Sequence, residues 1–315
     1  MSSEFELIAR YFSRQPADDS VQLGVGDDCT LLQPSPGHWL VVSVDTSVVD
    51  VHFPAAAPAH AIGHRALAVS LSDLAAMGAT PRWCLMALTL PEAQDDWLAD
   101  FARGFHELCD ASGVSLVGGD IARGELSIGV TVHGELPPGT ALRRNGARAG
   151  DVLAVTGTLG GGHGGLRAWQ DGERNLDDPL LAAYLLPQPR IAAGQALRGV
   201  ATAAIDVSDG LLADLRHVCE ASGVGADLDG EALPLAPGLV ERLGEEEAYR
   251  AALGGGDDYE LLVSLPPSAV DEARARLEAL GVPLTVIGSL AAEPGIRGVA
   301  DSIPSGWLHF RGDTP

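Results

Sequence analysis

Short apolar segments rich in β-branched residues alternate with segments of helical character along the chain, and this alternation restricts the fold more than any other feature. The segment HWLVVSVDTSVV (38–49) has the composition of a strand. From about Ala59 it is followed by AHAIGHRALAVSLSDLAAMG, which predicts a helix that ends at Gly78. Further strand and helix patterns follow one another in both halves. This order favours an α/β protein with layered helices and sheets.

A polar stretch rich in Pro, Gly and Arg, PPGTALRRNGARAGD (137–151), separates the two halves. The chain has 315 residues, which exceeds the length at which a single core usually stops growing. We therefore expect two domains, residues 1–140 and residues 141–315. Each half has a strand ending in a carboxylate-bearing turn and a Gly-Gly-Asp turn, so an internal duplication is an open alternative.

The charge of the chain excludes several classes of partner and mechanism. Acidic residues outnumber basic residues 43 to 20, giving a formal charge of −23, which argues against nucleic acid or an anionic membrane as a partner. Every basic residue is arginine, and lysine is absent, which excludes a P-loop lysine, a Schiff base and a lysine general base. A phosphorylated ligand would have to be bound by arginine, backbone N–H groups and metal ions.

The cysteines and the N-terminal segment indicate the compartment. The four cysteines form no C-x-x-C pair and are expected to be reduced thiols, with Cys29 a packing residue and not a nucleophile. The segment MSSEFELIARYF lacks the basic and apolar regions of a signal peptide. No apolar run approaches membrane-spanning length. We expect a cytoplasmic protein without a membrane partner.

Aspartates occupy strand ends and glycine turns, the positions at which α/β proteins build their binding sites. These aspartates are Asp27, Asp28, Asp45, Asp120, Asp206 and Asp209. Asp73 differs, because it lies in an otherwise small and apolar helical segment and is expected to face inward. A buried carboxylate must be paired or fully hydrogen-bonded. Taken alone, Asp73 is better explained as a core residue bonded to backbone or arginine.

Taken together, these seven carboxylates predict hard metal ions. Oxygen ligands in this number favour Mg²⁺ or Ca²⁺ over zinc, which would recruit Cys and His. Mg²⁺ keeps several waters and prefers one or two carboxylates with phosphate oxygens. We therefore expect several ions, spread over the set, around a polyphosphate.

Two turns have the pattern of anion-binding helix starts. In DVSDGLLADL a helix is expected to begin near Gly210, so that Ser208, Asp209 and Gly210 present unpaired N–H groups. The glycine run TGTLGGGHGGL (156–166) repeats the arrangement. Such turns also occur without a ligand. Arg143 and Arg144 supply further positive charge, although arginines at a domain boundary are usually solvated.

Seven motifs in order resemble those of the thiamine-monophosphate kinase family, within the aminoimidazole ribonucleotide synthetase superfamily. They are GVGDDC (24–29), SVDTSVVDVHF (43–53), ALAVSLSDLAAMGATP (66–81), LVGGDIARG (116–124), ALRRNGARAGD (141–151), AIDVSDGLLADL (204–215) and GGDDYELL (255–262). The resemblance implies two α/β domains, a homodimer formed by strands of the N-terminal domain, and ATP bound in a cleft near both domains. It further implies ATP-dependent phosphorylation of thiamine monophosphate to thiamine diphosphate with several Mg²⁺ ions.

The resemblance also implies residue roles. The implied metal ligands are Asp28, Ser43, Asp45, Asp73, Asp120, Asp206 and Asp209, with Asp27 an additional candidate. The implied ATP contacts are Gly119, Asp120, Arg144 and Ser208, and the implied thiamine contacts are His52, Glu260 and Trp307. The family often has Gly-Asp-Ser-Ala-Ala-Gly-Leu where this chain has GGGHGGL (160–166), so that loop receives no residue-specific role.

The expected chemistry needs no general base, because an acceptor phosphate is already an anion near neutral pH. Transfer then depends on charge neutralisation and in-line positioning, without a phospho-enzyme. Two alternatives stay open: an amidine-forming ATP-dependent synthetase of the same superfamily, and a non-enzymatic Ca²⁺-binding protein whose aspartates only hold the fold together. A selenophosphate synthetase is disfavoured, because it would need a reactive cysteine near a lysine.

Overall fold

The chain divides into two compact units, which we describe separately. The computed structural model describes residues 4–15, 18–299 and 306. Unit 1 comprises Met1–Leu74 with Ala79–Ala141, and unit 2 comprises Ala75–Gly78 with Leu142–Pro315. Among the helices of the described residues, none combines the length and apolar character needed to cross a membrane.

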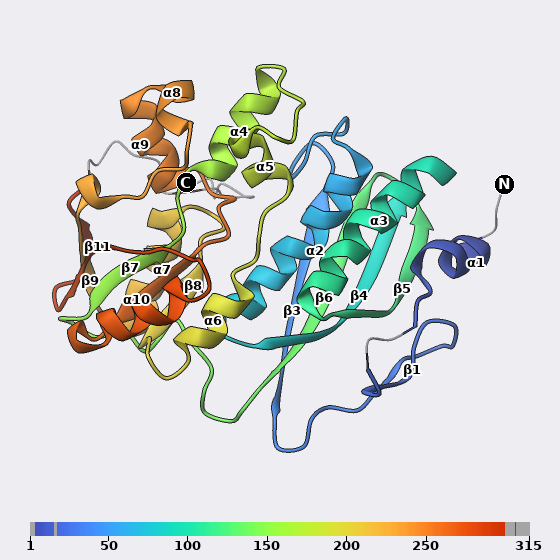
Figure 1. Ribbon diagram of the computed structural model, residues 1–315, viewed down its shortest axis with the longest axis horizontal. Coiled ribbons are helices and arrows are strands. Elements are labelled where there is room, and N and C mark those ends of the chain that lie inside the picture. The colour runs from blue at the N-terminus through green and yellow to red at the C-terminus, as the bar shows by residue number, and fades with distance from the viewer. Residues whose placement is uncertain (1–3, 16–17, 300–305, 307–315) are drawn as a thin grey trace, which may run out of the picture. The chain divides into compact units, whose positions relative to one another are not determined.

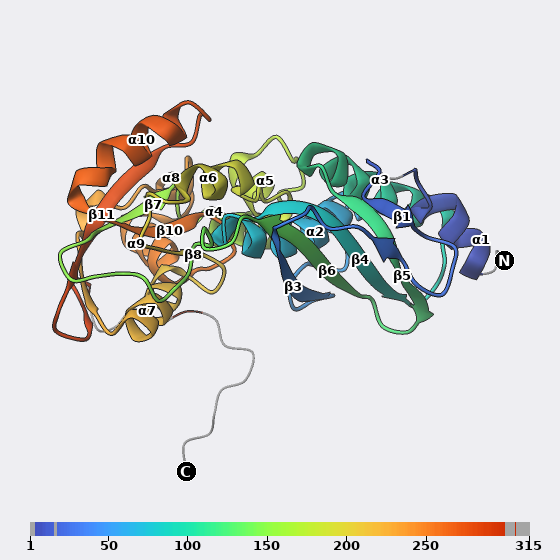
Figure 2. The same cartoon turned by 90° about the horizontal axis from the view of Figure 1, so that it is seen from below.

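Unit 1 is built on a four-stranded sheet in the order β3-β6-β4-β5. Strands β4 and β5 pair in parallel, and the other neighbours pair antiparallel. Helices α2 and α3 lie on one face of this sheet (Figures 1 and 2). The elements of unit 1 are α1 (Glu4–Leu7), η1 (Ile8–Phe12), β1 (Val21–Leu23), β2 (Leu31–Leu32), β3 (Trp39–Val48), α2 (Ala59–Ala76), β4 (Thr80–Leu90), α3 (Asp95–Ser112), β5 (Ser115–Arg123) and β6 (Ser127–Leu136).

The small residues of α2 allow the two helices of unit 1 to pack with their backbones in contact. A Cβ atom at Gly63 would lie 2.1 Å from the carbonyl oxygen of Phe101, and one at Gly104 would lie 1.9 Å from that of His60. Two glycines, one on each helix, are therefore required for the close approach of α2 to α3. This packing fixes the helix that carries Asp73 over the sheet.

Strand β3 has two faces of different character. Ser43 and Asp45 point toward the helices, whereas Leu40, Val42 and Val44 alternate with them and are exposed. Because β3 is an edge strand and this face carries no helix, unit 1 has an apolar open face.

Unit 2 is built on a six-stranded sheet in the order β12-β9-β11-β7-β10-β8. The β12–β9 pair is parallel and the others are antiparallel. The strands are β7 (Val152–Thr156), β8 (Ala203–Asp206), β9 (Gly225–Leu228), β10 (Leu261–Leu265), β11 (Leu284–Ala291) and β12 (Ile296–Arg297). The helices are α4 (Gly161–Gln170), α5 (Pro179–Leu185), α6 (Ile191–Leu197), α7 (Leu211–Ser222), η2 (Gly230–Ala232), α8 (Leu239–Leu243), α9 (Glu245–Gly254), η3 (Pro267–Ala269) and α10 (Val270–Glu278).

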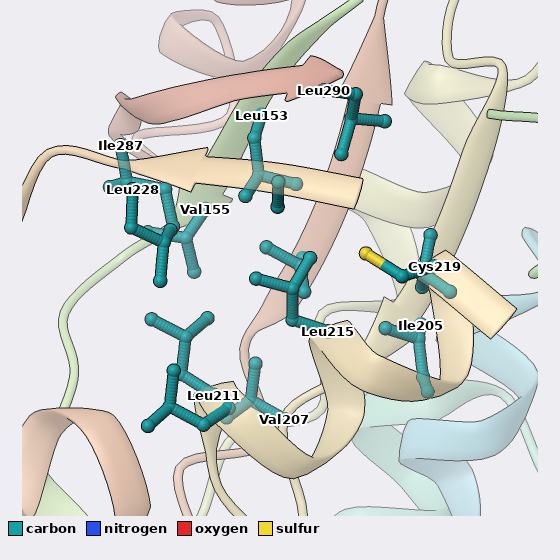
Figure 3. Packing of buried hydrophobic residues seen from close by; sticks show 14 of the residues in the cluster. Leu153, Val155, Ile205, Val207, Leu211, Leu215, Cys219, Leu228, Ile287 and Leu290 are labelled. Carbon is teal, nitrogen blue, oxygen red and sulfur yellow. The ribbon is translucent and has the colours of Figure 1, made fainter. Parts of the chain in front are cut away.

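Both faces of the unit 2 sheet are buried, which explains the continuous apolar runs of its strands. On one face, Leu211 and Leu215 of α7 pack against Leu153 and Val155 of β7 (Figure 3). On the other face a second cluster joins the alternate strand positions to α6 and α10. All the side chains of strand β8, which ends at Asp206, are buried between the two layers of helices. This burial fixes the position of the turn that leads into α7.

Candidate active site

Two of the predicted aspartate motifs line one cleft in unit 1. Asp27, Asp28, Gly119 and Asp120 all border a cleft of about 650 Å³, between the turn that follows β1 and strand β5. Its apolar lining comes from the N-terminal helices and from β4 and β5, and includes Phe5, Ile8, Phe12, Leu85, Met86 and Leu116. The structure thus brings GVGDDC and LVGGD to one cleft, whereas their roles as metal ligands and ATP contacts stay predictions.

Within this cleft the two adjacent aspartates behave differently. One oxygen of Asp27 accepts the N–H of Asp28 at 2.8 Å, so Asp27 stabilises the turn. The side chains of Asp28 and Asp120 are exposed and accept no hydrogen bond from the described part of the chain. Cys29 is exposed and lines the same cleft, so the prediction that it is a packing residue is wrong.

A second group of predicted ligands lies between β3 and α2. The hydroxyl of Ser43 donates a hydrogen bond to the carboxylate of Asp73, which therefore faces the sheet as predicted. Burial and the neighbouring charge of Asp73 raise the pKa of Asp45 to about 6, against a smaller opposite effect of the Ser70 hydroxyl. Two carboxylates are thus held beside each other in a partly buried place, an arrangement that favours a cation.

The cleft and the Asp45–Asp73 pair are too far apart to share one metal ion within this chain. Asp45 lies on β3 and Asp120 on β5, at opposite edges of the sheet. Three strand spacings separate them, about 14 Å. Their side chains also point to opposite faces, because Asp120 is in register with the exposed Ala87 whereas Asp45 faces the helices. Among the described residues, no three His, Cys, Asp or Glu side chains gather closely enough to hold an ion alone.

The predicted anion site at the start of α7 is already filled by the protein. The N–H groups of Ser208, Asp209 and Gly210 all donate to one oxygen of Asp214, at 3.0, 3.2 and 3.2 Å. The prediction that these groups are unpaired is therefore wrong, because a carboxylate one turn into the helix reaches back to them. Burial, together with the charges of Asp206 and Asp209, raises the pKa of Asp214 to about 7.

The glycine run at the start of α4 is filled in the same way. The N–H groups of Gly160 and Gly162 donate to the two oxygens of Asp258, at 2.8 and 3.1 Å. Burial is the main reason that the pKa of Asp258 rises to about 7. Neither Asp214 nor Asp258 was identified from the sequence, although both lie inside quoted motifs. The available signal for Asp214 was its place four residues after the turn glycine Gly210, whereas Asp258 lies 98 residues from Gly160.

Glu260 lies at the start of β10 and is almost completely enclosed. Arg190 donates to both of its oxygens, from Nε at 2.7 Å and from Nη2 at 2.6 Å, and the Thr156 hydroxyl donates at 2.7 Å. A Cβ atom at Gly157 would lie 1.9 Å from Oε1, so only glycine fits above the carboxylate. No local pattern pointed to Arg190, because this pairing joins positions 70 residues apart.

The remaining predicted residues are placed as follows. Nδ1 of the half-buried His52 accepts the N–H of Val48 at 3.0 Å, which gives this histidine a structural bond in the turn after β3. The side chain of Arg144 is exposed, and its carbonyl accepts the Ser222 hydroxyl at 2.8 Å. Trp307 lies outside the described residues.

Comparison with known proteins identifies the domains. Residues 26–136 match the family described as AIR synthase related protein, N-terminal domain. Residues 148–301 match the AIR synthase related protein, C-terminal domain. The prediction of a two-domain fold of this type is confirmed.

Relatives extend over the full length of the chain. The thiamine-monophosphate kinase of Salmonella typhimurium strain LT2 is 43% identical over 98% of both chains. The crystal structure of thiamine-monophosphate kinase from Stenotrophomonas maltophilia K279a is 46% identical, with a TM-score of 0.85 over 92% of this chain and 93% of that one. A structure described as AaThiL complexed with AMPPCP and TMP is 31% identical, with a TM-score of 0.79 over 88% and 89%. The chain belongs to the thiamine-monophosphate kinase family, as its seven motifs predicted.

Proposed function

We propose that this chain, as a thiamine-monophosphate kinase, transfers the γ-phosphoryl group of ATP directly to the phosphate of thiamine monophosphate, with Mg²⁺ ions held by its aspartates. The products are thiamine diphosphate and ADP. The observation that carries the metal assignment is the pairing of Asp45 with Asp73, where burial and like charge raise the pKa of Asp45 to about 6. Such a pair is costly without a cation and favourable with one.

The three clusters of aspartates fit Mg²⁺ better than they fit an ion whose ligands all come from the protein. Among the described residues, no three Asp, Glu, His or Cys side chains gather closely enough to enclose an ion, so each group supplies only one or two carboxylates. Mg²⁺ takes this number when water and phosphate oxygens complete its shell. We assign Asp28 and Asp120 to the cleft, with Asp27 supporting the turn, and Ser43, Asp45 and Asp73 to the β3–α2 group. A third group is Asp206 and Asp209 at the start of α7. Bound Mg²⁺ would neutralise phosphate charge and hold the reacting oxygens in line.

The substrate contacts are proposed by motif. Gly119, Asp120, Arg144 and Ser208 are assigned to ATP, which the exposed side chain of Arg144 supports. His52, Glu260 and Trp307 are assigned to the thiamine side. Residues 1–140 thus form the domain for ATP and Mg²⁺ binding and for dimerisation, and residues 141–315 complete the site.

The chain's own residues bind and orient two anions and are not required to move a proton. The phosphate of thiamine monophosphate is already ionised near neutral pH, so no side chain has to deprotonate it. The described residues present no activated nucleophile beside a base in these groups, which supports direct transfer. Holding donor and acceptor phosphates in line is then the main contribution of the protein.

The open face of unit 1 supports a homodimer formed by the N-terminal domain. Leu40, Val42 and Val44 are 50%, 52% and 63% exposed on one face of an edge strand, next to Trp39 at 55%. A continuous apolar face of this kind marks an interaction surface.

A cytoplasmic location stays a prediction from the sequence.

The function is tested by incubating the protein with ATP, Mg²⁺ and thiamine monophosphate and measuring thiamine diphosphate and ADP. Equal amounts of both products are expected, and none when EDTA is added. A folded protein that forms neither product would contradict the proposal. Binding of Ca²⁺ without turnover of ATP would then favour the non-enzymatic alternative, and ATP turnover only with another acceptor would favour a synthetase.

A further inference from the structure

Arg190 and Glu260 form a fixed unit at the start of α6 and β10. The side chain of Glu260 is 4% exposed, and the two nitrogens Nε and Nη2 of Arg190 bind its two oxygens side by side. The Thr156 hydroxyl occupies a third acceptor position, and the backbone of Gly157 covers the carboxylate. A carboxylate has about four acceptor positions, so little of Glu260 is left for a ligand.

The guanidinium group of Arg190, in contrast, has one accessible nitrogen, Nη1. Its side chain is 29% exposed, and Nη1 donates to none of the described residues. The guanidinium cannot rotate away, because the paired hydrogen bonds to Glu260 fix its plane. Pro189 precedes it and fixes the backbone where α6 begins. The structure therefore presents two oriented N–H donors at a constant position.

The accessible Nη1 group of Arg190 is suited to bind a phosphate group. Arginine matches phosphate oxygens with directed N–H donors. Because the chain contains no lysine, arginine is also the only residue type whose side chain carries a permanent positive charge. Glu260 neutralises much of the guanidinium charge, so the contact acts at short range and orients the anion. A buried ion pair adds little to stability compared with apolar residues of the same size, so stability alone does not explain this unit.

We propose that Arg190 binds a phosphate group of one of the two substrates through Nη1, and that Glu260 is a positioning residue that holds Arg190. This inference rests on the proposed kinase function. It changes the role of Glu260 from a direct contact to a residue that acts through its partner. The phosphate belongs either to thiamine monophosphate or to ATP, and separate KM values for the two substrates distinguish these sources.

The test compares Arg190→Gln with the wild-type enzyme. Loss of a charge-assisted phosphate contact is expected to raise the KM of one substrate about 10- to 100-fold, and to leave the KM of the other within about twofold. Arg190→Lys keeps a charge but loses the fork, so an intermediate value is expected. Calorimetric titration with thiamine monophosphate alone and with ATP alone should show the same selective loss of affinity. The matched control is Arg250→Gln, which removes an exposed arginine paired with Glu246 and should change neither KM.

Glu260 variants separate positioning from direct contact. Glu260→Gln should raise the same KM by less than Arg190→Gln does, because Arg190 remains but is held less firmly. If Arg190→Gln does not fold because it leaves a buried charge, the double variant Arg190→Met/Glu260→Gln removes both charges and should show the same selective KM increase. Unchanged KM values in a folded Arg190 variant, or a larger effect of Glu260→Gln than of Arg190→Gln, would overturn the proposal. Thiamine diphosphate formation by the wild-type enzyme tests the proposed function independently.

Discussion

Replacing Asp214 by Asn should stabilise the metal-free protein at alkaline pH. All three N–H groups of the α7 turn, those of Ser208, Asp209 and Gly210, donate to a single oxygen, so the amide oxygen of Asn can take its place. Burial, with the charges of Asp206 and Asp209, raises the pKa of Asp214 from an ordinary value of 3.8 to about 7. This rise corresponds to about 4 kcal/mol of unfolding free energy, as an upper limit.

The sign of the effect follows from proton binding. The folded state holds the proton of Asp214 more tightly than the unfolded state, so its contribution to stability is present below about pH 4 and is lost as pH rises to about 7. The unfolding free energy of Asp214→Asn minus that of wild type should therefore grow by about 2 to 4 kcal/mol between pH 4.5 and pH 8. Urea denaturation in EDTA measures it.

The control for this prediction is Asp271→Asn. Asp271 is an exposed carboxylate on α10, paired with Arg274, so its loss removes the same charge without burial. Its difference from wild type should stay within about 0.5 kcal/mol at every pH. A pH-independent difference for Asp214→Asn would refute the reasoning, since it would mean that the buried carboxylate is not costly to ionise. Mg²⁺ should reduce the effect, because it would neutralise Asp206 and Asp209.

Three further changes test other parts of the structure. Asp73→Asn should keep the fold and lower kcat/KM by at least about 100-fold, measured by thiamine diphosphate formation, whereas loss of folding with unchanged activity per folded molecule would make Asp73 structural. Gly157→Ala should lower the unfolding free energy by about 2 kcal/mol or more, measured by urea denaturation, because the new methyl meets Glu260 at a positive φ of 56°; a loss below about 0.5 kcal/mol would contradict this contact. Val44→Asp should convert a dimer to a monomer in analytical ultracentrifugation, and a monomeric wild type would disprove the proposed interface.

The sequence was sufficient for features that depend on local patterns. The strand at 38–49, the helix after Ala59 and the inward direction of Asp73 follow from composition and spacing, and the structure agrees. In each case the determining neighbours lie within a few residues, or in a motif of recognisable order.

Features that depend on long-range pairing could not be predicted. The partner of Glu260 is Arg190, and no periodicity or motif connects the two positions. Asp258 fills the start of α4 from 98 residues away, which no local pattern indicates, whereas Asp214 fills the start of α7 from only four residues after Gly210. The expectation of free N–H groups failed for this reason: a helix start attracts any anion, including one from the same chain.

These internal carboxylates limit how unit 2 can bind phosphate. A helix start usually offers its N–H groups to a phosphate, but here those groups at α4 and α7 already bind Asp258 and Asp214. A phosphate could take their place only by displacing a buried carboxylate. With lysine absent, the remaining positive groups are arginine side chains and metal ions. An arginine held in place by a buried glutamate, as Arg190 is, is then the kind of group that can orient a phosphate where the backbone cannot.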